Sequence, residues 1–169
     1  MSEYSLRWVI SPLPTEMETQ ALLNCKELIK KCTGEEYTIE LLRSMPVSPT
    51  CGSLILIPTG IESQQALNEN MIQGILWVMR LDAHTVRILT IMVAENHRGQ
   101  GHAAEAWMKF RRLAMDDGAR SVTLEVRQEN DVAFDFYSRR GLVVLGRLSD
   151  YYRDTFGIVM HGPLRDEDA

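Results

Sequence analysis

The chain has 169 residues, of which 45% are hydrophobic and 24% charged, a composition that excludes disordered and fibrous classes and fits one globular domain, residues 1–169. Its 23 acidic residues outnumber 18 Lys and Arg, and the net charge of −5 argues against nucleic acid as a partner. No apolar run approaches the roughly 20 residues that cross a bilayer, and Glu3 and Arg7 lie where a signal peptide is apolar, so we expect a cytoplasmic protein with no membrane partner.

The first part of the chain predicts a strand followed by two helices. Residues 7–10 are apolar enough for a strand. A helix is expected from residue 15 or 16 to about residue 31, with Gly34 as its stop, because five residues recur there at helical spacing: Leu22, Leu23, Cys25, Leu28 and Ile29. A second short helix is expected over 35–45, before a proline.

The middle of the chain predicts the heart of a sheet. Residues 53–57 favour a strand, whereas 58–69 has the composition of an irregular polar insert. Two long apolar runs follow, 71–81 and 86–93, and the polar turn residues between them predict an antiparallel hairpin of two central strands.

The last part alternates helices and strands. A helix of about fourteen residues should begin at Ala103 and end at Asp117-Gly118. The elements expected after it are a strand over 121–126, a helix over 131–140 stopped by Gly141, and strands over 142–148 and 158–160. The order of elements predicts a single-domain α/β (α+β) fold with a central sheet flanked by helices.

Cysteine and histidine spacings predict no metal site and no disulfide framework. The three cysteines, Cys25, Cys32 and Cys51, show no CxxC spacing, so we expect free thiols. The four histidines have no ligand spacing, and His97 and His102 are assigned no catalytic role.

The loop after the second central strand is suited to bind phosphate. Its sequence, Arg98-Gly99-Gln100-Gly101-His102-Ala103-Ala104, contains two glycines and leads into the positive end of a helix. Residues 97–112 contain four Lys or Arg against one Glu, a local charge of +3. The spacing Gly99-x-Gly101-x-x-Ala104 formally matches a dinucleotide fingerprint, but it follows an antiparallel hairpin, and the Lys-Ser/Thr pair of a P-loop is missing.

The alternative spacing, Arg98-x-x-Gly101-x-Ala103, is similar to the Q/R-x-x-G-x-G/A signature of the GNAT acetyltransferase superfamily. Residues 124–142, LEVRQENDVAFDFYSRRGL, resemble the LEVR-x-x-N-x-x-A-x-x-x-Y-x-x-x-G-F segment of ribosomal-protein N-terminal alanine acetyltransferases (RimI type), with Leu142 in place of phenylalanine. The resemblance covers 71–160, the expected acetyl-CoA-binding core, and leaves 1–70 as an acceptor-side region without a match. It implies a GNAT-like fold with a mixed, mostly antiparallel sheet.

The resemblance also implies roles for individual residues, with acetyl-CoA as the acetyl donor. Glu125 corresponds to the glutamate proposed as general base, and Tyr137 to the tyrosine beside the CoA sulfur. Asn130 corresponds to the asparagine that binds the pantetheine arm, and Tyr151 and Tyr152 to a tyrosine pair that contacts an acceptor peptide. The backbone of Ile91, Met92 and Val93 would hold the acetyl and pantetheine portion, and residues 98–104 the pyrophosphate: Arg98, Gly99, Gln100, Gly101, His102, Ala103 and Ala104.

These roles agree with the chemistry of acetyl transfer. An α-amino group has a pKa near 7.7 to 8.0 and must lose a proton before it attacks a thioester, and a carboxylate can take that proton. A phenol can hydrogen-bond or protonate the departing thiolate. All three cysteines precede residue 52, so direct transfer is favoured over a cysteinyl intermediate.

Simpler structural interpretations stay open for each of these residues. Glu125 and Arg127 can form a cross-strand ion pair, Tyr137 can be a core aromatic, and Asn130 can be an N-cap. Tyr151 and Tyr152 can form a β-hairpin rim. The expected function is therefore an N-acetyltransferase acting on a peptide N-terminus; the alternatives are a GNAT enzyme for a small amine (polyamine, amino acid or aminoglycoside) and a non-catalytic acyl-CoA-binding module, and a homodimer is left open.

Overall fold

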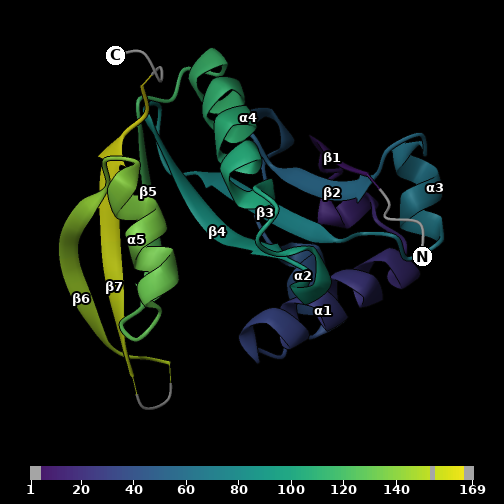
Figure 1. Cartoon of the computed structure of the whole chain (residues 1–169), viewed down its shortest axis with the longest axis horizontal. Coiled ribbons are helices and arrows are strands. Elements are labelled where there is room, and N and C mark those ends of the chain that lie inside the picture. Colours follow the sequence, from purple (N-terminus) through teal and green to yellow (C-terminus); the bar gives the residue numbers. More distant parts are fainter. Residues whose placement is uncertain (1–4, 153–154, 166–169) are drawn as a thin grey trace.

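The computed structural model of this chain describes residues 5–152 and 155–165, without the side chains at 150–152 and 155. A seven-stranded sheet has the order β1-β2-β3-β4-β5-β7-β6, and only β4 and β5 are paired in parallel. The strands are β1 (Leu6–Ile10), β2 (Leu54–Pro58), β3 (Gly74–Arg80), β4 (Thr85–Val93), β5 (Ser121–Arg127), β6 (Val143–Tyr152) and β7 (Thr155–Pro163). The predicted mixed, mostly antiparallel sheet and its central hairpin are confirmed (Figure 1).

The helices are α1 (Thr19–Thr33), α2 (Ile39–Ser44), α3 (Ser63–Asn68), α4 (His102–Asp116) and α5 (Asp131–Arg139). Gly34, Gly118 and Gly141 follow three of them with φ of 77°, 95° and 90°, which confirms the predicted stops. No helix among the described residues is long and apolar enough to span a membrane.

Three predictions about the first half of the chain are wrong. The helix expected from residue 15 or 16 begins at Thr19, because Pro14–Glu16 forms a separate 3-10 turn. The helix expected over 35–45 covers only Ile39–Ser44, since Thr38 is its N-cap and accepts a hydrogen bond from the Leu41 N–H. The insert at 58–69 contains α3, which buries only two apolar side chains, Ala66 and Leu67.

Two hydrophobic cores lie on opposite faces of the sheet. Alternation along β2 sends Leu54 and Leu56 into the core that contains α4 and α5, and Ile55 and Ile57 into the core that contains α1, α2 and α3. The described members of the second core all come from residues 17–92. The helices on that face therefore cover the N-terminal part of the sheet.

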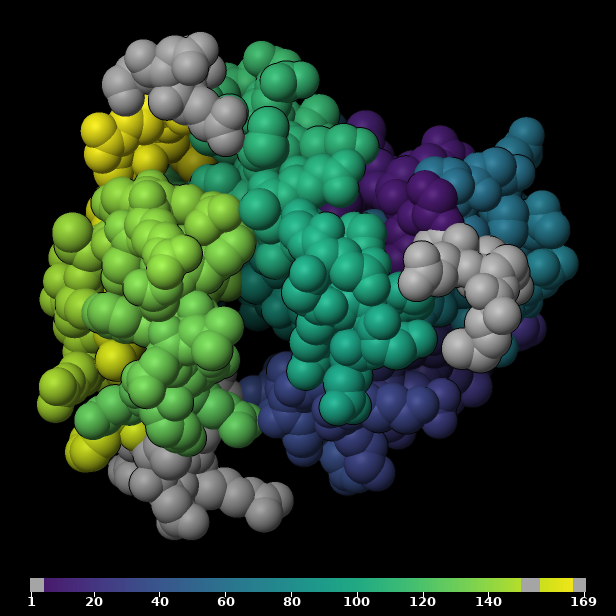
Figure 2. Space-filling view, in the orientation of Figure 1, coloured from purple at the N-terminus to yellow at the C-terminus, as the bar shows by residue number. Residues whose placement is uncertain are grey.

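The sheet opens between β4 and β5. The two strands pair only over Thr85–Arg87 and Ser121–Thr123. Beyond that point the register of β3 with β4 shifts between Trp77 and Val78, so that Leu89 is an extra residue on β4. A β-bulge of this kind bends its strand, and here it accompanies the separation from β5. The space-filling view is hollowed between the light-green residues of α5 and the teal residues near the start of α4, with blue α1 below (Figure 2).

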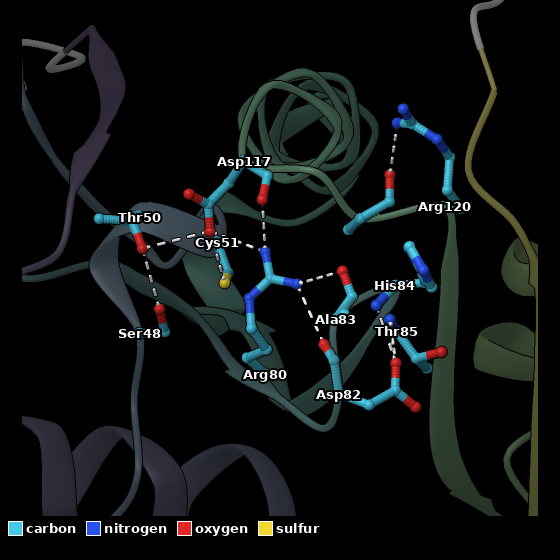
Figure 3. Close-up of polar contacts among 11 residues, drawn as sticks. Ser48, Thr50, Cys51, Arg80, Asp82, Ala83, His84, Thr85, Asp117 and Arg120 are labelled. Carbon is cyan, nitrogen blue, oxygen red and sulfur yellow. Dashed lines mark hydrogen bonds and ion pairs between the residues drawn. The ribbon is translucent and has the colours of Figure 1, made fainter.

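The closed end of this opening is tied together by polar contacts. Arg80 at the end of β3 donates hydrogen bonds to the Asp117 carbonyl (2.8 Å) and to Asp117 Oδ2 (2.7 Å), which connects the hairpin to the end of α4 (Figure 3). The same Asp117 Oδ2 accepts a hydrogen bond from the buried Cys51 thiol. Within the hairpin turn, Asp82 Oδ1 accepts from the backbone N–H groups of His84 and Thr85.

Candidate functional site

A cavity of about 240 Å³ fills the opening between β4 and β5, and we call it the slot. Its walls are residues 88–91 of β4 and 124–127 of β5. The end of α1 and the loop after it contribute Cys32, Thr33 and Glu35, whereas α5 and its N-cap contribute Asn130, Ala133 and Tyr137. Because α1 and α5 belong to opposite faces of the sheet, the slot is bordered from both faces. It brings together Glu125, Tyr137, Asn130 and Ile91.

Glu125 lies on β5 with alternating burial, so its side chain points away from Leu124 and Val126, as predicted. The carboxylate is 15% exposed and forms a two-point ion pair with Arg87 on β4: Nη2 lies 2.8 Å from Oε1, and Nε donates to Oε2 at 3.1 Å. Two donors on one carboxylate fix its orientation. Lone pairs remain on both oxygens, so the paired carboxylate can still accept a proton.

The alternative interpretation of Glu125, a cross-strand ion pair, is present in the structure, but the partner is Arg87 on β4 and Arg127 takes no part in it. Arg127 instead donates a hydrogen bond to the Thr33 carbonyl at the end of α1 (3.1 Å) and lies 3.7 Å from the Glu35 carboxylate. The reason is the opening of the sheet, which leaves Arg127 beside α1. Arg127 thereby connects β5 to α1 at the border of the slot.

Tyr137 is both a core aromatic and part of the slot. Its side chain is 4% exposed, and its ring packs 5.9 Å from Trp107 and 5.4 Å from Phe136, centroid to centroid. Burial raises the pKa of its phenol above the ordinary value of 10.0. The hydroxyl therefore stays protonated at neutral pH, as a hydrogen-bond donor must.

Asn130 is the N-cap of α5, which confirms the structural interpretation. Its Oδ1 accepts a hydrogen bond from the Ala133 N–H at 3.1 Å. The same residue lines the slot, so capping and ligand contact are compatible. The side chains of Tyr151 and Tyr152 lie outside the described part of the chain.

The loop from Arg98 to Ala104 has a backbone suited to a phosphate. Gly99 and Gly101 have φ of 76° and 83°, and a Cβ at either position would meet no heavy atom within 4 Å. Gly101 is the N-cap of α4, and no side chain caps the first N–H groups of that helix. An anion can approach these groups, so the loop fits the pyrophosphate of a nucleotide ligand.

For two predicted cofactor residues, Arg98 and His102, the structure shows surroundings that sequence reasoning missed. Arg98 Nε donates to the Val93 carbonyl at 3.0 Å, so its guanidinium is held against the end of β4. The Nδ1 atom of His102 is buried without a hydrogen-bond partner among the described residues. Gln100, Ala103 and Ala104 lie in the loop and first turn of α4, as predicted.

Cys32 is the functional candidate that the sequence did not reveal. It lines the slot and also a cavity of about 970 Å³ between α1 and the loops at 70–73 and 94–98. Its thiol donates a hydrogen bond to the Val93 carbonyl at 3.7 Å. The sequence argument against a cysteinyl intermediate, that all three cysteines precede residue 52, therefore does not hold for Cys32. Position in the sequence does not show which face of α1 lies against β4. The prediction of free thiols is confirmed.

Comparisons with known proteins give a family and a shared fold. The model of the Acetyltransferase (GNAT) family matches residues 24–142. Among solved structures, Ard1 from Thermoplasma volcanium has 22% sequence identity and a TM-score of 0.76, with 95% of this chain and 99% of that chain covered. The ribosomal-protein-S18-alanine N-acetyltransferase from Escherichia coli has 15% identity and a TM-score of 0.73, covering 98% and 99%. The NatC complex bound to Gag peptide and CoA has 18% identity and a TM-score of 0.76, covering 95% and 99%. No curated protein matches the chain in sequence.

Proposed function

The chain belongs to the GNAT acetyltransferase family, and on that premise we propose that it transfers an acetyl group from acetyl-CoA to a protein N-terminal α-amino group by direct attack. One observation carries the proposal. The slot is bordered by a carboxylate, Glu125, beside the α1 end and by a protonated phenol, Tyr137, on the α5 side. These are the proton acceptor and the hydrogen-bond donor that the reaction needs, at two borders of one cavity.

We propose that acetyl-CoA, the acetyl donor, binds along β4 and the start of α4. Beyond Arg87, β4 has no pairing with β5, so backbone groups of Ile91, Met92 and Val93 can bind the acetyl and pantetheine portion. The pyrophosphate lies on the loop at 98–104, and Asn130 contacts the pantetheine arm. An N–H near Met92 or Val93 stabilises the oxyanion that forms at the carbonyl.

Glu125 removes the proton from the acceptor ammonium, directly or through a water. The neutral nitrogen then forms the new C–N bond, and the C–S bond of the thioester breaks. Tyr137 donates a hydrogen bond or its proton to the departing sulfur. The second proton that the nitrogen loses on becoming an amide protonates the thiolate or restores the Tyr137 phenol, and the proton taken by Glu125 returns to solvent. Arg87 holds the Glu125 carboxylate in place at both oxygens.

The acceptor class is supported by the neighbours and by the acceptor side of the slot. Two of the structures above are named as N-acetyltransferases or contain a peptide and CoA. In this chain Glu35, in the loop between α1 and α2, lines the slot beside Arg127. A carboxylate at this border can attract an ammonium group, whether of a peptide N-terminus or of a small amine, so the choice of a peptide rests on the neighbours.

The test is the Glu125→Gln variant. We expect kcat to fall by about 10²- to 10⁴-fold because the amide cannot accept the proton, while the affinity for acetyl-CoA stays within about twofold. Glu129→Gln is the matched control, because Glu129 is exposed and does not line the slot. Thiol release is measured with N-terminal peptides and with small amines.

The outcomes separate the three functions. Turnover of peptides that depends on Glu125 supports the proposal, whereas turnover of polyamines or amino acids alone overturns the acceptor. Acetyl-CoA binding without turnover of any acceptor would show a binding module instead. Equal rates for wild type and Glu125→Gln would remove Glu125 from the mechanism.

A further inference from the structure

A second cavity, of about 550 Å³, lies between α4 and the C-terminal end of α5, and we call it the arginine cavity. Four arginines line it: Arg111, Arg139, Arg140 and Arg165. No Asp or Glu is among the described residues that line it. In a chain of net charge −5, the cavity therefore concentrates positive charge at one place.

Arg111 on α4 lacks a counter-charge among the described residues. It is only 9% exposed and forms no ion pair with any of them. One guanidinium nitrogen, Nη1, donates to the Arg165 carbonyl, but Nε is buried without any partner in the described part of the chain. Because a buried cation without a counter-charge is costly, the cavity is suited to hold an anionic group.

The chain itself has such a group directly after the cavity. Residues 166–168 are Asp-Glu-Asp, the only three consecutive acidic residues in the sequence, and they lie outside the described residues. The Arg165 carbonyl that accepts from Arg111 belongs to the peptide bond with Asp166. Bond lengths alone therefore keep the Asp166 carboxylate within about 8 Å of the Arg111 guanidinium, and three residues can span up to about 10 Å of the cavity.

We propose that the acidic segment 166–168 docks into the arginine cavity, gives Arg111 its counter-charge, and thereby weakens the binding of acetyl-CoA. Three negative charges match a cavity that is lined by four arginines. Because the segment is covalently held at Arg165, its effective concentration at the cavity is high, and docking does not require a tight contact.

The effect on acetyl-CoA rests on the proposed function, because it needs the pyrophosphate on the loop at 98–104. Ala104 belongs to that loop and also lines the arginine cavity, and Arg111 follows it by about 10 Å along α4. The docked segment thus lies within about one Debye length of the loop. Since acetyl-CoA is an anion, it binds tightly only to molecules in which the segment has left the cavity.

The experiment neutralises the segment in the triple variant Asp166→Asn/Glu167→Gln/Asp168→Asn. Without CoA, the melting temperature should fall by about 2 to 4 °C, because Arg111 loses its counter-charge. In calorimetry the same variant should bind CoA about three- to tenfold more tightly than wild type, as expected if the segment is docked in about 70 to 90% of the molecules. A chain that ends at Arg165 should behave in the same way, and both differences should shrink in about 0.5 M NaCl.

The matched control is Glu16→Gln/Glu27→Gln/Glu69→Gln. It changes the net charge by the same amount at three exposed residues that line neither the slot nor the arginine cavity and form no ion pair with a described residue. Its melting temperature should stay within about 1 °C of wild type, and its dissociation constant for CoA within about twofold.

The results that overturn the inference are distinct from failure of the proposed function. Opposite shifts of stability and CoA affinity in the triple variant, absent from the control, support it. An unchanged melting temperature would overturn docking, and a lower one with unchanged CoA affinity would overturn the effect on the donor. Equal gains in affinity in both variants would reduce that effect to net charge and overturn it as well. If CoA binds to none of these proteins, the proposed function fails, whereas the melting temperatures still decide whether the segment docks.

Discussion

At the scale of single residues, the proposed reaction depends on the protonated state of Tyr137. In Tyr137→Phe the ring still packs on Trp107 and Phe136, but the donor is lost. We expect kcat to fall about 10- to 100-fold, the range for a hydrogen bond to a charged group, with little change in melting temperature. Steady-state kinetics and thermal melts measure the two effects.

The pH profile gives an independent check on Tyr137. Activity should rise with pH as the acceptor amine, with an ordinary pKa near 7.7 to 8.0, loses its proton. Because burial raises the pKa of Tyr137 above its ordinary value of 10.0, the phenol keeps its proton and causes no fall in kcat below about pH 10. A wild-type decline between about pH 8 and pH 9.5 that is absent in Tyr137→Phe would contradict this assignment.

Cys32 tests whether transfer is direct. Its thiol lies in the slot and donates to the Val93 carbonyl, so it is placed where a cysteinyl intermediate would have to form. Direct attack predicts that Cys32→Ala keeps its kcat within about threefold of wild type, because the loss of one hydrogen bond from sulfur is small. Rates with acetyl-CoA and an N-terminal peptide are compared. Loss of turnover together with an acetylated Cys32 in the trapped wild-type protein would require a two-step route.

At the scale of elements, the Arg80–Asp117 contact couples the central hairpin to the end of α4. A double-mutant cycle of Arg80→Gln and Asp117→Asn should give a coupling energy of about 1 kcal/mol in urea unfolding, a modest value because both side chains are partly exposed. Arg80 lowers the pKa of the Asp117 carboxyl through its hydrogen bond. The coupling should therefore be full above the ordinary pKa of 3.8 and decline as the pH falls below it.

Arg120→Gln is the control for this cycle, because the Arg120 side chain donates a hydrogen bond only to the adjacent Ala119 carbonyl among the described residues (Figure 3). Its effect on stability should be additive with that of Asp117→Asn. A coupling near zero for Arg80 and Asp117 at neutral pH would mean that the contact orients the hairpin without stabilising it.

The elements that sequence predicts well are those with long apolar repeats. β3, β4, α4 and α5 lie within a few residues of their expected bounds, because long apolar runs around a polar turn specify the two strands and a glycine stop marks the end of each helix. α3 was missed because its six residues, SQQALN, contain only two apolar positions and are helical through packing on α1 and β2. The bulge at Leu89 has no signal in the sequence.

At the scale of the whole molecule, the opening of the sheet at that bulge explains why part of the candidate site could not be predicted from the sequence. The residues of the candidate site were found by their resemblance to a family motif, but Arg87 and Cys32 were not, because their part in the slot depends on the separation of β4 from β5. The ion pair of Glu125 with Arg87 joins residues on two strands that are 38 positions apart in the sequence. Only the parallel register of the strands brings those residues together.

The opening of the sheet also predicts how the molecule responds to its donor. A ligand that lies in the slot bridges β4 and α5, on the two sides of an opening where β4 pairs with β5 only over three residues at the closed end. At CoA concentrations about 100 times its dissociation constant, stability should rise by about 2.7 kcal/mol, and the melting temperature by about 5 to 10 °C. Hydrogen exchange should slow on both borders of the slot, at 88–93 and 131–134, and stay unchanged in β1 and β2.

Two glycine variants separate binding from stability in this experiment. Gly101→Ala and Gly60→Ala each place a Cβ at a positive φ, 83° and 81°, where no atom lies within 4 Å, so each should cost about 1 kcal/mol of backbone strain. Only Gly101 lies in the proposed pyrophosphate loop. The CoA-dependent rise in melting temperature should therefore shrink in Gly101→Ala and stay at the wild-type value in Gly60→Ala. Equal rises in both variants, or slowed exchange on one border alone, would mean that CoA does not bridge the slot.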